Sequence, residues 1–432
     1  MAPPFHSDKP LDSRFADLKR EIAESYPDFQ ERATNAWTEV LEALEQRTSE
    51  IISAGPKYIP QVDFKDLQSL TAEQLASIKR KGCLVIRNVV DDAQATEWKT
   101  ALDEFVQNNP TADGFPEGNK QFFNLYWTKP QVVARTHPNV LAASAWLNGL
   151  YHVKSGKALE GVDLSVSLSY ADRFRMRQPG GFWDAHPPHI DGGGIERWED
   201  PAFRAAYGDI LAGATWKEHD AYDIEARLNA KTSLYGRPDQ ATCFRTFQGW
   251  LAMTEISPGN GTLRLFPDIV LSNAYLILRP FFRPVAPALS ESLDAKDWKF
   301  DISTSEFPGM FPADIGYIGP HPEPGLHPHM RLDKAMTSVP TVQPGDMVFW
   351  HCDMVHAVEP EHTGSEDSAV MYIGATPKIP SNTAYVEKQR PCFVAAGPPP
   401  DYAKGKSEAG FVGIGTEADI VDSAGKVAMG FA

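Results

Sequence analysis

The first fifty residues carry apolar side chains at helical spacing. Phe15, Leu18 and Ile22 recur three and four positions apart, and charged residues fill most positions between them. This period places the apolar side chains on one stripe of an α-helix. A Gly-Pro pair, which is typical of a helix end, closes the pattern. The spacing therefore predicts a helix over residues 11–53, within an N-terminal arm of residues 1–57.

The next segment predicts a compact helix–strand–helix unit. Residues 71–80 begin with threonine, a favourable N-cap, and read as a helix. The run Gly-Cys-Leu-Val-Ile-Arg-Asn-Val-Val at 82–90 is apolar and β-branched, which indicates a buried strand. Two aspartates then open a helix with Trp98 and Phe105 on one stripe. This unit begins the main domain, which we expect to span residues 58–400.

From residue 162 the period changes from helical to alternating. Even-numbered positions from Leu164 to Met176 are mostly apolar, whereas odd-numbered positions are small and then cationic, ending in Arg173, Arg175 and Arg177. Alternation of this kind predicts a strand with two distinct faces. The apolar face should pack against a helical layer. The other face should line the polar interior of a barrel that holds an anionic ligand.

The rest of the chain predicts a mostly β core with one helical interruption. An insertion at about residues 195–231 reads as helical and would either cover the site as a lid or be peripheral. The segment 401–432 follows a Gly-Pro-Pro-Pro run and predicts an irregular C-terminal tail. Further strands are expected at 246–256, 261–266, 346–350, 355–358 and 369–373.

Composition narrows the classes of function. Apolar residues make up 42% and charged residues 23%, as in ordinary globular proteins. The net charge of −16 disfavours nucleic acid and anionic membranes as partners, which leaves a small-molecule substrate. The four cysteines form no CxxC pair, so neither a zinc site nor a disulfide framework is expected. The N-terminus lacks the apolar core of a secretory signal, and we expect a cytoplasmic protein.

The most specific chemical signal is His186-Pro-Pro-His-Ile-Asp-Gly-Gly-Gly. His189 and Asp191 are two positions apart, so in a strand both side chains leave from one face. One imidazole and one carboxylate, completed by a distant histidine, form the facial triad of non-haem Fe(II) oxygenases. Alone, this pair is weak evidence, because a core histidine and an aspartate in a glycine-rich turn would look the same.

Two histidines compete for the third position. Residues 344–358 predict a turn, an apolar strand, a tight turn and a second short strand, in the sequence Pro-Gly-Asp-Met-Val-Phe-Trp-His-Cys-Asp-Met-Val-His-Ala-Val. His351 lies at the tight turn, whereas His356 begins the second strand in a β-branched context. We favour His356. His321, His327 and His329 offer a second metal site, but a proline-rich loop often carries histidines with no ligand role.

The order of these motifs resembles a known enzyme family. Five segments resemble the phytanoyl-CoA-hydroxylase-like branch of Fe(II)/2-oxoglutarate-dependent oxygenases. They are residues 82–90, Arg177-Gln-Pro-Gly, His189-x-Asp191, Asn260-Gly-Thr-Leu-Arg-Leu-Phe-Pro and the stretch from Pro344 to His356. Arg-Phe-Arg-Met-Arg-Gln-Pro-Gly, Pro-His-Ile-Asp-Gly-Gly and Ile-Glu-Arg-Trp-Glu-Asp are similar to the YbiU-like family. The similarity covers roughly residues 60–400.

The resemblance implies an α+β fold with a double-stranded β-helix (jelly-roll, cupin-like) core, flanked by the N-terminal and inserted helices. It implies Fe(II) bound by His189, Asp191 and His356, with 2-oxoglutarate and O₂ as cosubstrates. One group of relatives, the TqaL-like fungal enzymes, forms an aziridine from L-valine on the way to 2-aminoisobutyrate. Oxidation of L-valine is therefore the specific expectation. The alternative is hydroxylation of another small amino acid or carboxylic acid.

One feature departs from the family pattern. Many members carry an arginine on the last barrel strand that binds the far carboxylate of 2-oxoglutarate, but residues 364–373 contain none. Arg175, Arg177 and Arg264 are the available donors, and a guanidinium suits bidentate carboxylate binding. His186 and Arg173 are candidate substrate contacts. The missing arginine also keeps open a non-oxygenase metal-dependent cupin-like enzyme, or a non-catalytic ligand-binding barrel.

Overall fold

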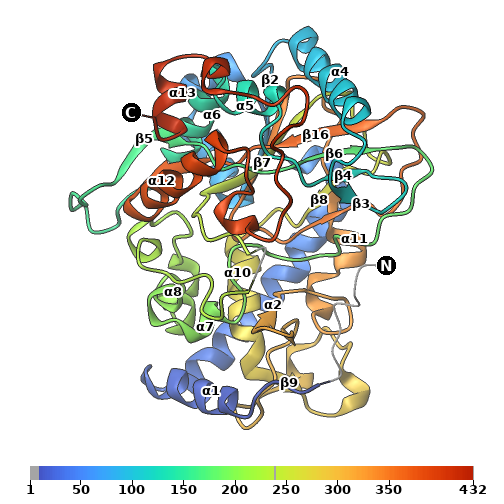
Figure 1. Cartoon of the computed structure of the whole chain (residues 1–432). Coiled ribbons are helices and arrows are strands. Elements are labelled where there is room, and N and C mark those ends of the chain that lie inside the picture. The colour runs from blue at the N-terminus through green and yellow to red at the C-terminus, as the bar shows by residue number, and fades with distance from the viewer. Residues whose placement is uncertain (1–8, 238–239, 432) are drawn as a thin grey trace.

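The computed structural model describes residues 9–237 and 240–431. The fold is mixed α/β with several sheets, which confirms the predicted combination of helices and strands. Figure 1 shows the strands β2, β4, β6, β7 and β16 in the upper part of the molecule and α1, α2, α10 and β9 in the lower part. No helix among the described residues is both long enough and apolar enough to cross a lipid bilayer.

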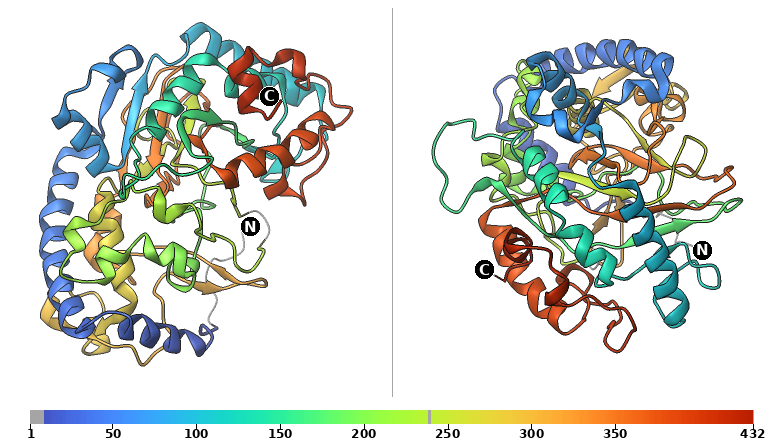
Figure 2. Two further views of the ribbon diagram at one scale, coloured as in Figure 1. Left: turned by 90° about the vertical axis from the view of Figure 1, so that its left-hand side faces the viewer. Right: turned by 90° about the horizontal axis from the view of Figure 1, so that it is seen from above.

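The N-terminal arm is helical, as its apolar spacing predicts, but it is divided into two helices. Helix α1 spans Arg14–Glu24 and α2 spans Phe29–Ala54. Pro27 lies between them, and Asp28 adopts a left-handed backbone with φ of 52°. A proline and a left-handed residue both interrupt a helix, although the apolar spacing continues on either side. Figure 2 shows α2 running along one side of the molecule to the level of the sheets.

Two sheets enclose an apolar core between them. The larger has the order β1 (Gln61–Asp63), β2 (Cys83–Arg87), β14 (Met347–His351), β7 (Phe247–Ala252), β16 (Ser368–Tyr372), β6 (Phe174–Arg177), β4 (Phe122–Phe123) and β3 (Gly114–Phe115). The smaller has the order β13 (Thr337–Ser338), β8 (Leu263–Leu265) and β15 (His356–Val358). Val85, Val348 and Val370 of the larger sheet share one buried cluster with Leu263 and Leu265 of the smaller.

The alternating stretch after residue 162 forms two strands, not the one predicted. Strand β5, Asp163–Leu168, pairs with β17, Thr376–Lys378, whereas β6 joins the large sheet beside β16. The period of two is a local property, and it cannot indicate that the two halves pair with different partners.

The remaining helices differ from expectation in two places. Helix α10, Ile269–Leu278, was not predicted, because all but one of its residues are buried and it has no polar face. The insertion is only partly helical and contains the short helices α7 (Glu196–Glu199), α8 (Pro201–Ala205) and α9 (Gly208–Leu211). The other elements are α3 (Ala72–Lys81), α4 (Asp92–Asn108), α5 (Lys129–Arg135), α6 (Pro138–Asn148), α11 (Leu332–Ala335) and α12 (Pro380–Val394), with the hairpins β9 (Phe282–Pro284) with β10 (Trp298–Phe300) and β11 (Phe311–Pro312) with β12 (Tyr317–Ile318).

The C-terminal segment is largely irregular but docks onto the body of the protein. It contains helix α13, Ser423–Ala428, and the buried Glu408. The Glu408 carboxylate accepts hydrogen bonds from the backbone N–H groups of Tyr126 and Trp127. Residues 401–431 are therefore attached through buried polar contacts as well as apolar ones.

Candidate metal centre and adjoining cavity

His189, Asp191 and His356 converge at one end of the smaller sheet. The backbones of His189 and His356 exchange two hydrogen bonds, of 2.9 and 3.0 Å, and their ring centroids lie 4.2 Å apart. Asp191 Oδ1 lies 3.7 Å from His189 Nε2, and Asp191 Oδ2 lies 3.6 Å from His356 Nε2. One potential ligand atom from each residue lies within 4.8 Å of the others. This spacing suits three bonds to one divalent ion.

Backbone carbonyls fix both imidazoles in the tautomer that a metal requires. His189 Nδ1 lies 2.7 Å from the carbonyl of Pro187, and His356 Nδ1 lies 2.9 Å from that of Met354. A carbonyl only accepts, so each Nδ1 carries the proton and each Nε2 presents a lone pair. Burial and the neighbouring His356 lower the pKa of His189 to about 4, so the ring is neutral at pH 7.

The structure distinguishes His356 from His351, the other candidate for the third ligand position. His351 is fully buried at the end of β14, where Nε2 contacts the carbonyl of Ala221 at 3.0 Å and the Tyr151 hydroxyl at 2.6 Å. Its Nδ1 accepts from the backbone N–H of Asp353 at 3.1 Å. Both ring nitrogens are therefore engaged, and His351 is a core histidine.

His351, Cys352 and Asp353 form the second of two three-residue clusters whose ligand atoms converge among the described residues. Burial raises the pKa of the Cys352 thiol to about 11, so it stays protonated. His321, His327 and His329 are in neither cluster. Because the His351 nitrogens are engaged and the thiol is protonated, we assign this second cluster a structural role.

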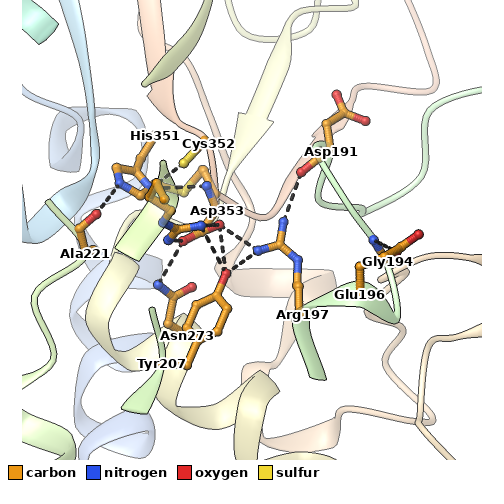
Figure 3. Close-up of polar contacts among 12 residues, drawn as sticks. Asp191, Gly194, Glu196, Arg197, Tyr207, Ala221, Asn273, His351, Cys352 and Asp353 are labelled. Atoms are coloured by element: carbon orange, nitrogen blue, oxygen red, sulfur yellow. Dashed lines mark hydrogen bonds and ion pairs between the residues drawn. The ribbon is translucent and has the colours of Figure 1, made fainter. Parts of the chain in front are cut away.

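Asp353 is the centre of a buried ionic network that reaches the candidate metal site. Its carboxylate pairs with Arg197, at 2.6 Å, and with Arg227, and all three side chains are at most 4% exposed. The other Arg197 nitrogen, Nη2, donates to the backbone carbonyl of Asp191 at 3.0 Å. Figure 3 shows this link and shows the Asp191 carboxylate pointing away from the network. The network thus supports the backbone of Asp191 and leaves its carboxylate available.

The triad opens into a cavity of about 1050 Å³, measured with its open mouth. The Asp191 side chain is 44% exposed, and this exposed part lines the cavity. The walls come from β6, β7, β14, β16 and the two triad segments, and they include His186, Arg173, Arg175, Asp172, Arg245, Gln248, Trp350, Tyr372 and Tyr402. The cavity is therefore lined by more cationic than anionic side chains.

The structure retains only one of the three arginines predicted to bind the cosubstrate. Arg175 lines the cavity and is 2% exposed. Arg177 instead donates to the carbonyls of Gly261, Glu359, Gly181 and Pro360, and Arg264 donates to the carbonyl of Met336. Neither Arg177 nor Arg264 lines the cavity. Strand periodicity alone cannot show where a long side chain ends.

The predicted substrate contacts both lie on the cavity wall. His186 stacks on Trp183 and accepts a hydrogen bond of 2.8 Å from its indole N–H. Arg173 pairs with Asp172 at 3.0 Å and donates to the Tyr402 hydroxyl at 3.1 Å. Their positions agree with the expectation, which remains a prediction.

Arg245 and Gln248 are cavity residues that the sequence analysis missed. Arg245 lies two residues before the start of β7, and Gln248 lies inside that otherwise apolar strand. A polar residue in the middle of a buried strand is a signal that could have identified Gln248.

The strand register places Arg175 and Gln248 at different levels of the cavity. Gln248 pairs with Trp350, whose ring lies 5.2 Å from that of His356. Arg175 pairs with Val370, and Val370 pairs with Ala252, four residues along β7 from Gln248. Four residues of a strand correspond to roughly 13 Å. Arg175 therefore lies at one level of the cavity wall, and Gln248 lies at another, near Arg245.

Several buried donors of the cavity wall have no hydrogen-bond partner among the described residues. They are Arg175 Nε, Gln248 Nε2 and Trp350 Nε1. Leaving a buried donor unpaired costs about 1–3 kcal/mol, so such groups normally meet a ligand or water. All three are donors, which favours a ligand rich in oxygen acceptors. These donors therefore fit a carboxylate-bearing ligand, beside the three residues, His189, Asp191 and His356, whose ligand atoms fit a divalent ion such as Fe(II).

Comparisons with known proteins cover nearly the whole chain. The Gig2-like family model matches residues 9–431. YbiU of Escherichia coli K12, an uncharacterised protein, is 29% identical over 450 residues, which cover 100% of this chain and 99% of YbiU. The structure of GlcNAc Inducible Gene 2 (GIG2) from Candida albicans is 32% identical, with a TM-score of 0.86, and covers 99% of this chain and 91% of GIG2. A candidate oxidoreductase of Salmonella typhimurium LT2 is 26% identical, with a TM-score of 0.80, over 99% and 100% of the two chains.

Proposed function

Since this chain belongs to the Gig2-like family, we propose that it is a family member that works as an Fe(II)/2-oxoglutarate-dependent oxygenase of a small molecule. The observation that carries the proposal is the convergence of His189, Asp191 and His356 beside a cavity lined with unpaired donors. Two imidazoles and one carboxylate on one side of a metal leave the other positions open for a cosubstrate and O₂.

The strand order supports a double-stranded β-helix. Strands β14, β7, β16 and β6 are consecutive in the large sheet, and residues of β14, β7 and β16 share an apolar cluster with Leu263 and Leu265 of β8, the central strand of the smaller sheet. The bridge between His189 and His356 adds the HxD segment to the edge of the smaller sheet. We infer that these eight segments form the barrel, with the triad at one end of it.

Each residue of the site has a defined task in this proposal. His189 and His356 present neutral Nε2 atoms, and Asp191 adds a carboxylate. Arg175 would bind the far carboxylate of 2-oxoglutarate, since it lines the cavity and has an unpaired Nε among the described residues. Bound Fe(II) supplies oxidation of an aliphatic C–H, in which one oxygen atom of O₂ enters succinate and CO₂ is released. The surrounding walls limit access of water.

For the substrate we propose a small polar molecule, with L-valine as the specific candidate. Closing a ring between its nitrogen and β-carbon removes two hydrogens, and the second oxygen atom then leaves as water. Hydroxylation of L-valine, or of another small amino or carboxylic acid, would instead retain that oxygen in the product. Mass spectrometry separates the two, because the product loses two hydrogens in one case and gains one oxygen in the other.

The test measures succinate formed from 2-oxoglutarate by protein reconstituted with Fe(II). We expect turnover that requires Fe(II) and O₂, and loss of bound iron in His189→Ala and His356→Ala. Arg175→Gln should weaken 2-oxoglutarate binding by roughly tenfold or more. Arg264→Gln, on the other side of the smaller sheet from the cavity, is the matched control and should bind it normally.

A metal-dependent enzyme without 2-oxoglutarate is the second candidate. Residues 364–373 favour this candidate because they contain β16 but no arginine. Many 2-oxoglutarate-dependent oxygenases carry the arginine that binds the cosubstrate on the corresponding strand. Iron binding without any binding of 2-oxoglutarate would support this candidate and contradict the oxygenase.

A further inference from the structure

Arg245 crosses the large sheet over a glycine. It precedes β7, and its side chain lies against Gly374, which follows β16. A Cβ atom added to Gly374 would lie 3.2 Å from Arg245 Cδ and 3.0 Å from the carbonyl of Phe247. The backbone at Gly374 is not left-handed, so glycine is needed there for space and not for conformation. The glycine therefore gives the Arg245 side chain a path along the cavity wall.

Among the described residues the Arg245 guanidinium pairs with one carboxylate, that of Asp172, and lies 5.0 Å from the centre of the Tyr170 ring. Asp172 Oδ2 lies 3.7 Å from Arg245 Nη1, which is longer than a direct hydrogen bond. The other oxygen, Asp172 Oδ1, accepts from the backbone N–H and Nε of Arg173. Both Arg245 and Asp172 are 11% exposed in their side chains and line the cavity. Arg245 thus retains the capacity to bind a carboxylate bidentately.

Gln248 adds a second donor in the same region. It is 5% exposed, lines the cavity and has an unpaired amide Nε2 among the described residues. In an antiparallel pair it lies opposite Gly374, because the adjacent bridge joins Phe247 to Ala375. The Arg245 guanidinium and the Gln248 side-chain amide therefore flank Gly374, roughly 13 Å along the strands from the level of Arg175.

We propose that Arg245 and Gln248 bind the carboxylate of a small substrate, at the opposite end of the cavity from Arg175. This inference rests on the proposed oxygenase function, in which Arg175 holds the cosubstrate. Two separated cationic regions allow two carboxylates to bind at once, each with its own donors. The substrate class is then a small carboxylic acid, amino acids included, that reaches the metal from the Gly374 side.

The test is calorimetric binding to the full chain, loaded with Fe(II) and 2-oxoglutarate without oxygen. The probes are the twenty common L-amino acids and the C3–C6 monocarboxylic acids, and each acid that binds is paired with its carboxamide. We expect at least one acid to bind, and its amide to bind roughly 10- to 100-fold more weakly, because the charge-assisted hydrogen bonds are lost.

The variants then assign the charge dependence to Arg245. In Arg245→Gln the preference for acid over amide should fall to about one, while 2-oxoglutarate affinity stays at the wild-type value. Gly374→Ala should weaken acid binding less, by displacing the Arg245 side chain. Arg390→Gln, an exposed arginine that donates to the carbonyl of Gly430, is the control and should change nothing.

The possible outcomes distinguish a failure of the proposed oxygenase function from a failure of the carboxylate site at Arg245. If the wild-type protein does not bind 2-oxoglutarate with Fe(II), the oxygenase function itself is contradicted. If it binds 2-oxoglutarate but binds none of the acids, or if Arg245→Gln keeps the acid preference, only the carboxylate site at Arg245 is overturned. Intact 2-oxoglutarate binding in the variants excludes misfolding as the cause of a loss.

Discussion

The buried carboxylate of Asp353 should be among the most sensitive positions of this chain. It balances Arg197 and Arg227, and all three side chains are at most 4% exposed. Burial alone would raise the pKa of Asp353, but Arg227 and Arg197 lower it well below its ordinary value, so the group is ionised. Asp353→Asn keeps the shape and leaves two guanidinium groups without a counter-charge in the protein interior.

The expected cost follows from that loss of charge. Removing one partner of a buried ion pair costs about 3–5 kcal/mol, because the remaining charge stays desolvated. For a chain of 432 residues the unfolding entropy is about 0.9 kcal/mol/K, so Tm should fall by about 3–6 °C if unfolding is one transition. Asp333→Asn, at an exposed aspartate, is the matched control and should stay within about 1 °C of wild type.

The same substitution should also weaken the metal centre, through Arg197. This arginine donates to the Asp191 carbonyl at 3.0 Å, and loss of an outer hydrogen-bond partner typically lowers metal affinity by about 10- to 100-fold. Calorimetric Tm and competitive Fe(II) titration measure the two effects on one preparation. An Asp353→Asn protein with wild-type Tm and wild-type iron affinity would refute the reasoning, since the network would then support neither the fold nor Asp191.

Three further predictions concern separate parts of the molecule. His351→Ala should retain iron but lose about 2–4 kcal/mol of stability, whereas His356→Ala should lose iron; metal content and urea unfolding distinguish them. Gly249→Ala should cost about 1–3 kcal/mol in urea unfolding, because the added methyl overlaps the Phe349 ring; an unchanged midpoint would contradict this. Burial raises the pKa of Glu408 to about 7, so its carboxyl destabilises the fold as pH rises from about 4.5 to 7, by up to about 3 kcal/mol. The urea midpoint of Glu408→Gln, relative to that of the wild type, should therefore rise between pH 5 and pH 8. If the two midpoints change equally with pH, the raised pKa of Glu408 is refuted.

Local spacing along the sequence was sufficient to predict much of the secondary structure and the types of residue in the site. The helix at 71–80, the apolar run before Asn88 and the strands around residues 247–252 and 347–351 were all predicted from the local sequence. The helix begins at a recognisable N-cap, and the strands are buried on both faces, which leaves short continuous apolar runs that can be recognised locally. The pairing of His189 with Asp191 also follows from local alternation, which places both on one face of an extended segment.

Tertiary structure decided which of these side chains meet. Arg175 and Arg177 alternate identically in the sequence, yet Arg175 lines the cavity and donates to one backbone carbonyl, whereas Arg177 lies outside the cavity wall and donates to four. Arg245 reaches the cavity past Gly374, a residue far away in the sequence, where an added Cβ atom would lie 3.2 Å from Arg245 Cδ. The choice between His351 and His356 likewise depends on which partners surround each ring. Such outcomes are set by register and packing between distant segments, and these long-range contacts leave no periodic trace in the chain.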